Sequence, residues 1–228
     1  MARNDKTPEP PKGPQQRSTA KPGDSGRQRR MLYLIVAAGI VALAVVLAVL
    51  VLGGGDEDAQ SALDGAGCTL ESFPAMPNVP DHADVPTLTT KPNWNSNPPT
   101  SGPHYGEWAV WNFYDEEVPL VKSVHNLEHG GVVIHYGPEV PSSEVEKLRA
   151  FYDDDPNGIL VAPLSSNGDE ITLSAWTAPD AATGTTDRGR GWLARCTSFN
   201  NDAFASFIQA HRYKGPERLS PEQLAPGS

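Results

Sequence analysis

The stretch VHNLEHGGVVIHYG, residues 124–137, passes from a helical pattern to a strand pattern at a pair of glycines. His125 and His129 stand four residues apart, so on a helical turn both rings project from the same face. Gly130 can adopt the positive φ that ends a helix, and the alternation over 131–137 is that of a strand. The stretch therefore predicts a helix, a tight junction and a strand, with histidines held at the junction.

The segments around this stretch predict the rest of one domain. Proline is frequent over 68–120, which disfavours long helices and central strands and indicates an ordered wrap of extended loops. Downstream, apolar residues recur at helical spacing or in short strand-like runs, and the turn SSNGD joins two of these runs into a predicted hairpin. The predicted helices are 141–154 and 200–213, and the further strands are 158–165, 170–178 and 191–196. The predicted fold class is α+β, a small mostly antiparallel sheet with two covering helices and a proline-rich wrapping segment.

An uncharged apolar segment, residues 31–52, precedes this domain. As a helix it would be about 33 Å long, enough to cross a hydrocarbon core of roughly 30 Å. RQRR stands just before it and GGGDED just after it, which by the positive-inside rule puts the N-terminus in the cytoplasm and the domain outside. A cleaved signal peptide is the alternative, but the apolar run is long for one and no A-x-A site ends it. We expect one transmembrane helix and a single-pass protein of the cell membrane.

The predicted anchor separates parts of different charge. Up to Arg30 there are eight basic and three acidic residues, whereas the whole chain has a formal net charge of −10. The basic tail has too few apolar groups to fold. Membrane lipid is the expected partner through the anchor, and an envelope protein is a candidate partner; the short tail without aromatics does not indicate nucleic-acid binding. The predicted parts are a disordered basic cytoplasmic tail (1–30), the transmembrane helix (31–52), a flexible linker (53–67), the extracytoplasmic domain (68–217) and a disordered C-terminal tail (218–228).

The chain contains two cysteines, Cys68 and Cys196, and both follow the predicted anchor. An even number of cysteines in an oxidising compartment favours a disulfide, and two free thiols are the alternative. Neither cysteine lies in a C-x-x-C motif, so the sequence does not indicate a dithiol oxidoreductase. We therefore expect a structural disulfide that closes most of the domain.

The histidines of the domain are candidates for a metal site. His104 lies in NPPTSGPH, where prolines restrict the backbone on either side of it. Together with His125 and His129 it could ligate one ion, and His82 or Glu128 could complete the site. Imidazole and carboxylate ligands suit Zn²⁺ or Cu²⁺, so a Cu or Zn ion is the expected cofactor. A shared ion would require the imidazole nitrogens to lie within about 4 Å of one another.

Two other interpretations of these residues stay open. The same histidines and Glu128 could form a metal-free buried network in a structural or interaction module of the cell envelope. HNLEH also matches H-x-x-E-H, the inverted zinc-protease motif, so a metal-dependent hydrolase is a third hypothesis. That motif needs a long helix, whereas this helix is predicted to end at Gly130. The sequence therefore favours metal binding or handling over enzymatic turnover.

Three segments resemble the domain of unknown function 3105 family of bacterial proteins, whose members are membrane-anchored or exported. They are NPPTSGPHYGEWAVWNFYDEEVP (97–119), LVKSVHNLEHGGVVIHYG (120–137) and YKGPE (213–217). The resemblance covers about 68–217 and implies no activity, substrate or cofactor. It does point to 98–104 and 125–131 as the positions to examine. The sequence thus predicts a single-pass extracytoplasmic protein of unknown function with a His-based Cu or Zn site.

Overall fold

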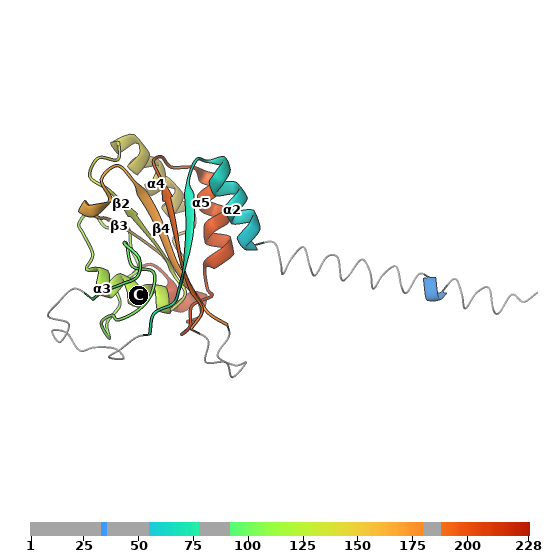
Figure 1. Ribbon diagram of the computed structural model, residues 1–228. Helices are drawn as coiled ribbons and strands as arrows, with labels where there is room; N and C mark the ends of the chain where they lie inside the picture. The colour runs from blue at the N-terminus through green and yellow to red at the C-terminus, as the bar shows by residue number, and fades with distance from the viewer. Residues whose placement is uncertain (1–32, 36–54, 78–91, 180–187) are drawn as a thin grey trace, which may run out of the picture. The chain divides into compact units, whose positions relative to one another are not determined.

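The computed structural model describes residues 33–35, 55–77, 92–179 and 188–228 of the chain (Figure 1). The predicted cytoplasmic tail, almost all of the predicted anchor 31–52 and His82 lie outside these residues. Within the described ranges, no helix is long and apolar enough to cross a membrane. The domain described below lies within residues 49–228.

A five-stranded sheet forms the centre of the domain (Figure 1). Its order is β1-β5-β4-β2-β3, and of its neighbouring pairs β2 and β3 are parallel while the others are antiparallel. The strands are β1 (Thr69–Pro74), β2 (Val132–Tyr136), β3 (Ile159–Pro163), β4 (Ile171–Thr177) and β5 (Arg190–Cys196). The predicted α+β class with a mostly antiparallel sheet is confirmed.

The predicted hairpin between β3 and β4 is wrong, because β2 lies between these two strands. The helix α4 (Ser142–Asp154) connects β2 to β3, and a parallel pair needs a crossover of this kind. The turn after β3 does form, as the short 3-10 helix η1 (Ser165–Asn167), but it carries the chain past β2 to the other side. Both β2 and β3 are mostly apolar and almost fully buried, as strands covered on both faces are.

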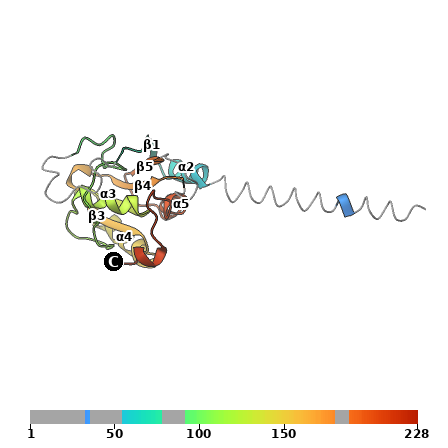
Figure 2. The ribbon, with the colours of Figure 1, turned by 90° about the horizontal axis from the view of Figure 1, so that it is seen from below.

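Three helices cover one face of the sheet, where two were predicted. Besides α4 and α5 (Asn201–His211), the helix α2 (Gly55–Gly65) packs along α5 (Figures 1 and 2). Residues 53–67 were predicted to be a flexible linker, and this is wrong for α2. Its Ala59 and Leu63 stand four apart and are fully buried, and its acidic first turn favours a helix N-terminus.

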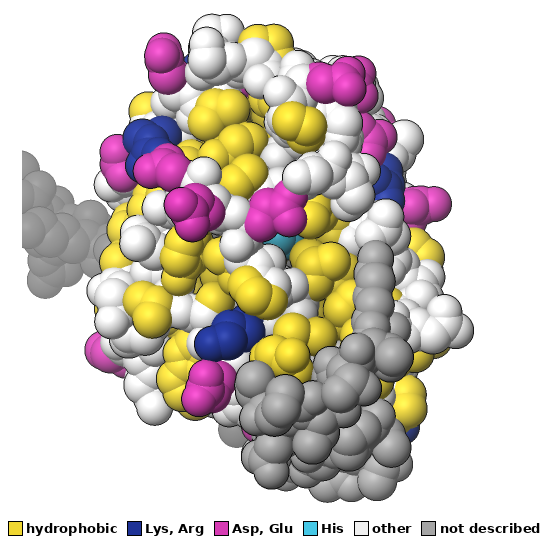
Figure 3. All heavy atoms as spheres, turned by 90° about the vertical axis from the view of Figure 1, so that its left-hand side faces the viewer, with side chains coloured by type: hydrophobic (Ala, Val, Ile, Leu, Met, Phe, Trp, Pro, Cys, Tyr) yellow, Lys and Arg dark blue, Asp and Glu magenta, His cyan; other side chains and the backbone are white. Residues whose placement is uncertain are grey.

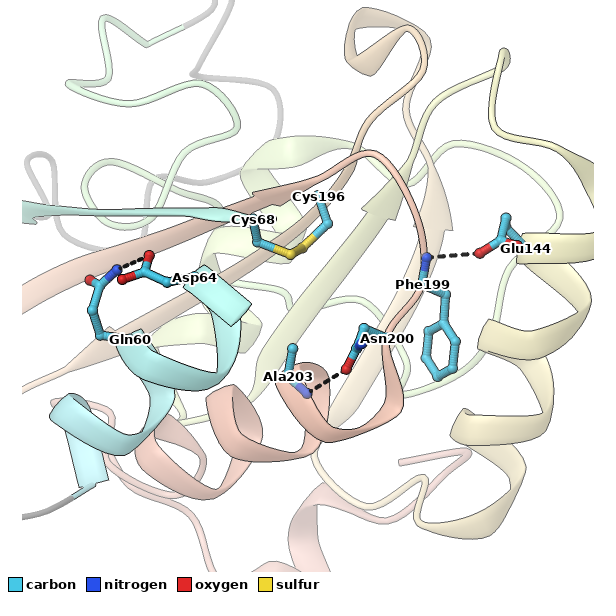
Figure 4. Close-up of a disulfide and its surroundings, with 8 residues drawn as sticks. All are labelled: Gln60, Asp64, Cys68, Glu144, Cys196, Phe199, Asn200 and Ala203. Carbon is cyan, nitrogen blue, oxygen red and sulfur yellow. Dashed lines mark hydrogen bonds between the residues drawn. A yellow bond between two sulfur atoms is a disulfide. The ribbon is translucent and has the colours of Figure 1, made fainter. Parts of the chain in front are cut away.

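The predicted disulfide between Cys68 and Cys196 is confirmed (Figure 4). Cys68 lies three residues after the end of α2 and Cys196 ends β5, so the bond ties the chain between α2 and β1 to the strand that pairs with β1. The two cysteines are 128 positions apart in the sequence. In Figure 4 the bond lies above the start of α5, where the Asn200 side chain caps the helix by accepting from the Ala203 N–H.

The other face of the sheet is covered by α3 (Leu120–Glu128), by residues 94–118 of the proline-rich wrap and by the C-terminal segment. Residues 218–228 were predicted to be disordered, but they contain the 3-10 helix η3 (Pro221–Leu224). Leu224 is fully buried and its carbonyl accepts from the Gly158 N–H, so the predicted disordered tail is wrong. This second core contains Ala109, Trp111, Val118, Val124, Leu127, Val133, Leu160, Ala162, Trp176 and Leu224.

Candidate functional site

The side chains of the segment HNLEHGG make different contacts at the end of α3. Leu127 is buried in the second core, and the Asn126 side chain exchanges two hydrogen bonds with the backbone of Ala109, at 2.8 and 3.0 Å. Asn126 thereby fixes the wrap against the helix. The remaining polar side chains, His125, Glu128 and His129, turn into the space between the helix and the wrap.

Both glycines of the segment are required by close contacts. Gly130 has a φ of 89°, and a Cβ added there would lie 2.9 Å from the Gly215 nitrogen. A Cβ at Gly131 would lie 2.1 Å from the Trp111 ring. The junction predicted from the glycines is therefore also the place where the C-terminal segment and a core tryptophan approach the backbone.

His104 comes to this helix end from the wrap. Its Nε2 lies 2.9 Å from Glu128 Oε2, although the two residues are 24 positions apart. His104 is fully buried, as are Thr100 and Ser101 before it, and Thr100 packs so closely on β5 that a Cβ at Gly191 would lie 2.0 Å from its Oγ1. The rigid placement predicted for the histidine of PPTSGPH is thus achieved by packing of the wrap against the sheet.

Three imidazoles are oriented in the same way. The Nδ1 atoms of His104, His125 and His129 lie 2.8, 2.7 and 2.9 Å from backbone carbonyl oxygens, which belong to Gly102, Tyr105 and Glu217 respectively. A carbonyl can only accept, so each Nδ1 carries the proton and donates it. In the neutral ring, the lone pair is then on Nε2. Metal-ligating histidines are commonly fixed in this way, because the bond orients the ring and selects its tautomer.

Three of the predicted ligands converge. One ligand atom each from His104, His125 and Glu128 lies within 4.8 Å of the other two, and all three residues are buried. Around a tetrahedral ion with bonds of about 2.0–2.1 Å, ligand atoms are about 3.3 Å apart, so the widest pair would have to close by roughly 1.5 Å. The separation of 4.8 Å exceeds the expected limit of about 4 Å, so a bound ion requires these side chains to move closer together. We name the three residues the inner cluster.

His129 does not belong to the inner cluster. Its ring is next to that of His125, with centroids 4.5 Å apart, and its Nε2 is buried without a hydrogen-bond partner among the described residues. Trp108 places its ring edge-on to both histidines, at centroid distances of 5.4 Å from His125 and 5.1 Å from His129. On the face in Figure 3, a small area of histidine side chain is visible between hydrophobic and acidic side chains.

The contact between His104 and Glu128 requires a positive charge or an extra proton. With Nδ1–H donated to Gly102, the neutral His104 ring turns its Nε2 lone pair toward the carboxylate. Two facing lone pairs at 2.9 Å repel each other. Either a proton shared by the two groups or a cation bound by both removes this repulsion.

Burial keeps His125 neutral. Desolvation, reinforced by the positive charges that His129 and His104 can carry, lowers the pKa of His125 from 6.5 to about 4. At neutral pH the ring therefore presents a lone pair, as a metal ligand must. The sequence spacing could not show this effect, because it depends on burial and on His104, which comes from a separate segment.

The C-terminal segment supports the cluster through its backbone, which the sequence reasoning missed. The Glu217 N–H donates to the Glu128 carbonyl at 3.0 Å, and the Glu217 carbonyl holds His129. Gly215 approaches so closely that a Cβ there would lie 2.2 Å from the Glu128 carbonyl oxygen. We call these backbone contacts of Gly215 and Glu217 the clamp. Their only sequence signal was the segment YKGPE (213–217), which resembles the family.

A comparison with known protein families gives one result for this chain. A family model described as "Protein of unknown function (DUF3105)" matches residues 87–224, which include the inner cluster, His129 and the clamp. No curated protein and no solved structure is detectably similar to the chain.

Proposed function

Because the family model covers more than half of its length, this chain belongs to the DUF3105 family of proteins of unknown function, and we propose that it binds a single Zn²⁺ or Cu²⁺ ion at the inner cluster. The ligands are Nε2 of His104, Nε2 of His125 and the carboxylate of Glu128. The role is to bind and hand over the ion rather than to turn over a substrate, in a domain anchored outside the cytoplasmic membrane.

The proposal rests on one observation above all: His104 and His125, each held through Nδ1, and the buried carboxylate of Glu128 each place one ligand atom within 4.8 Å of the other two. A cation shared by His104 and Glu128 removes the repulsion between their lone pairs and stabilises the buried carboxylate. Two imidazoles and one carboxylate suit ions that accept nitrogen and oxygen ligands.

The choice of ion follows from the ligands. Both cysteines are in the disulfide, so no thiolate is available for a soft ion such as Cu⁺. Two imidazoles and one carboxylate suit Zn²⁺ and Cu²⁺, and Cu²⁺ binds more tightly at such a site according to the general order of divalent ions. Which of the two is bound in the cell then depends on supply.

The location is proposed on separate grounds. The uncharged segment 31–52, with basic residues before it and acidic residues after it, favours a single-pass anchor with an external domain. The disulfide supports an oxidising environment for the domain.

A metal-free ion pair is the second candidate, because 2.9 Å is also the distance of a hydrogen bond between a protonated His104 and an ionised Glu128. The cluster would then stabilise the junction of wrap and helix in an envelope interaction module. A metal-dependent hydrolase has less support. Glu128 contacts His104 directly and is buried, whereas a general base needs access to a water and a substrate.

Metal analysis distinguishes these candidates. The full-length protein in detergent is stripped with chelator, loaded with Zn²⁺ or Cu²⁺, desalted and analysed by mass spectrometry of the elements. We expect one ion per chain, and its loss in the variants His125→Asn and Glu128→Gln. Glu107→Gln is the matched control, since Glu107 is an exposed carboxylate paired with Lys122 and should leave the stoichiometry at one. Substoichiometric metal that is the same in all variants would support the ion pair instead.

A further inference from the structure

We propose that Trp108 closes the entrance to the inner cluster and that His129 is the first ligand of an entering ion, which it passes on to His125. This inference rests on the proposed metal binding and adds the route by which the ion enters and leaves.

Exposure to solvent increases in one direction through the site. His104 is 0% exposed, His125 3%, His129 7% and Trp108 39%. The inner cluster is therefore deepest at His104, and His129 lies on the side where Trp108 meets the solvent. An ion that enters along this gradient reaches His129 before it reaches the His104 ring.

Trp108 is placed to block this direction. Its ring stands edge-on to the rings of both His125 and His129, with interplanar angles of 78° and 89°. The next residue, Ala109, is buried, and its backbone donates one hydrogen bond to the Asn126 side chain and accepts another from it. Because the backbone beside Trp108 is fixed, the ring can swing out about its side-chain bonds without displacing the wrap. A ring of this kind changes how fast an ion passes and leaves the ligands below it unchanged.

His129 has the chemistry of an entry ligand. Its Nδ1 is held by the Glu217 carbonyl, so its lone pair is on Nε2. Within the part of the chain that the structure describes, this atom is buried without a hydrogen-bond partner. A metal ion is about 3.2 Å from the centroid of an imidazole that binds it, so rings whose centroids are 4.5 Å apart can share one ion.

His129 cannot complete the inner cluster in the same arrangement, because its ligand atom lies outside the group formed by His104, His125 and Glu128. The ion would first exchange a water ligand for His129 Nε2 and then bind His125 as well. It would next exchange His129 for His104 and Glu128. His125 is the ligand common to both positions, so the ion is never released on the way.

The rates of zinc transfer test this route. The full-length protein in detergent is loaded with Zn²⁺, and transfer to the chromophoric chelator 4-(2-pyridylazo)resorcinol is followed by absorbance; loading is measured by the reverse mixing. For Trp108→Ala we expect loading and release both to become faster by about tenfold, the factor for the loss of about 1.4 kcal/mol of edge-on ring contacts. The Kd should stay nearly constant. Val110→Ala, which truncates the exposed apolar side chain two positions away, is the matched control and should keep wild-type rates.

His129→Asn tests the entry ligand separately. The asparagine amide can still donate to the Glu217 carbonyl, so the clamp stays in place while Nε2 is removed. We expect slower loading and slower release with little change in Kd. A Kd weakened by more than about tenfold at an unchanged loading rate would make His129 a resident ligand and overturn the route.

The outcomes separate this inference from the proposed function. If wild-type protein retains zinc and Trp108→Ala has the rates of Val110→Ala, the entrance at Trp108 is wrong and the inner cluster stands. If the wild type retains no zinc, the metal site itself is wrong, and the route is overturned with it.

Discussion

Replacement of His211 by phenylalanine should make the protein more stable, and more so at acidic pH. His211 lies in α5, where its ring stacks on Trp192 and meets Phe207 edge-on, with centroids 4.6 and 4.5 Å away. In the residues that the structure describes, neither ring nitrogen has a hydrogen-bond partner. Asp56 Oδ1 lies 3.8 Å from Nδ1, too far for a hydrogen bond, and its side chain is largely exposed. A phenyl ring fills the same space and carries no polar atom.

The magnitude follows from two terms. Desolvation, with a smaller contribution from Lys214, lowers the pKa of His211 from 6.5 to about 3. Between these values the unfolded chain binds a proton that the folded chain does not, so the free energy of unfolding decreases as pH falls below 6.5. At pH 5 this loss is about 2 kcal/mol relative to pH 8. The buried nitrogens without partners cost about 1–3 kcal/mol more at either pH.

Urea unfolding at pH 8 and pH 5, followed by tryptophan fluorescence in the presence of chelator, measures both terms. His211→Phe should exceed the wild type by about 1–3 kcal/mol at pH 8 and by about 2 kcal/mol more at pH 5. Gln209→His is the matched control, since it adds an exposed histidine to the same helix and should not change the pH dependence. The other buried histidines are present in both proteins and cancel. If the wild type and His211→Phe lose equal free energy between the two pH values, the reasoning is refuted.

Three further changes test the fold and its link to metal. Gly131→Ala should lower the free energy of unfolding by about 1–3 kcal/mol in a urea titration, because the new methyl group meets the buried Trp111 ring. Gly65→Ala is the control: a Cβ at Gly65 has no described atom within 4 Å, so this variant should stay within about 0.5 kcal/mol of wild type. Joint replacement of Cys68 and Cys196 by serine should cost about 5 kcal/mol, seen as a lower Tm in circular dichroism, since the bond closes a loop of 128 positions; an unchanged Tm would contradict this. Zinc at about 100 times its Kd should add about 2.7 kcal/mol to the wild type, and no rise in Tm with zinc would speak against binding.

The local elements of the fold could be predicted from sequence, but their pairing could not. Apolar alternation predicted the strand at 131–137 and helical spacing predicted the helix at 200–213, because both patterns reflect burial of one local face. The position of β2 between β3 and β4 depends on which strands pair with each other. The turn after β3 does not determine this pairing. The helix α2 was missed because only Ala59 and Leu63 of its acidic sequence are fully buried.

The candidate site was predictable in its side chains and not in its backbone contacts. His104, His125 and Glu128 were all predicted as ligands from their residue types and from the stiff or helical segments that carry them. The hydrogen bond from His129 to the Glu217 carbonyl joins residues 88 positions apart, and any residue supplies a carbonyl. For this reason the separation of His129 from the inner cluster could not be inferred from the spacing of HNLEH.

X-ray absorption at the zinc edge of the loaded full-length protein tests the central claim most directly. The inner cluster predicts nitrogen and oxygen neighbours at about 2.0–2.1 Å, no sulfur, and the outer-shell scattering of two imidazoles. The scattering of one imidazole should be lost in His125→Asn, provided that zinc is supplied at a concentration that still occupies the weakened site. A zinc spectrum without imidazole scattering, or one that is identical in wild type and His125→Asn, would contradict the assignment of the metal to His104, His125 and Glu128.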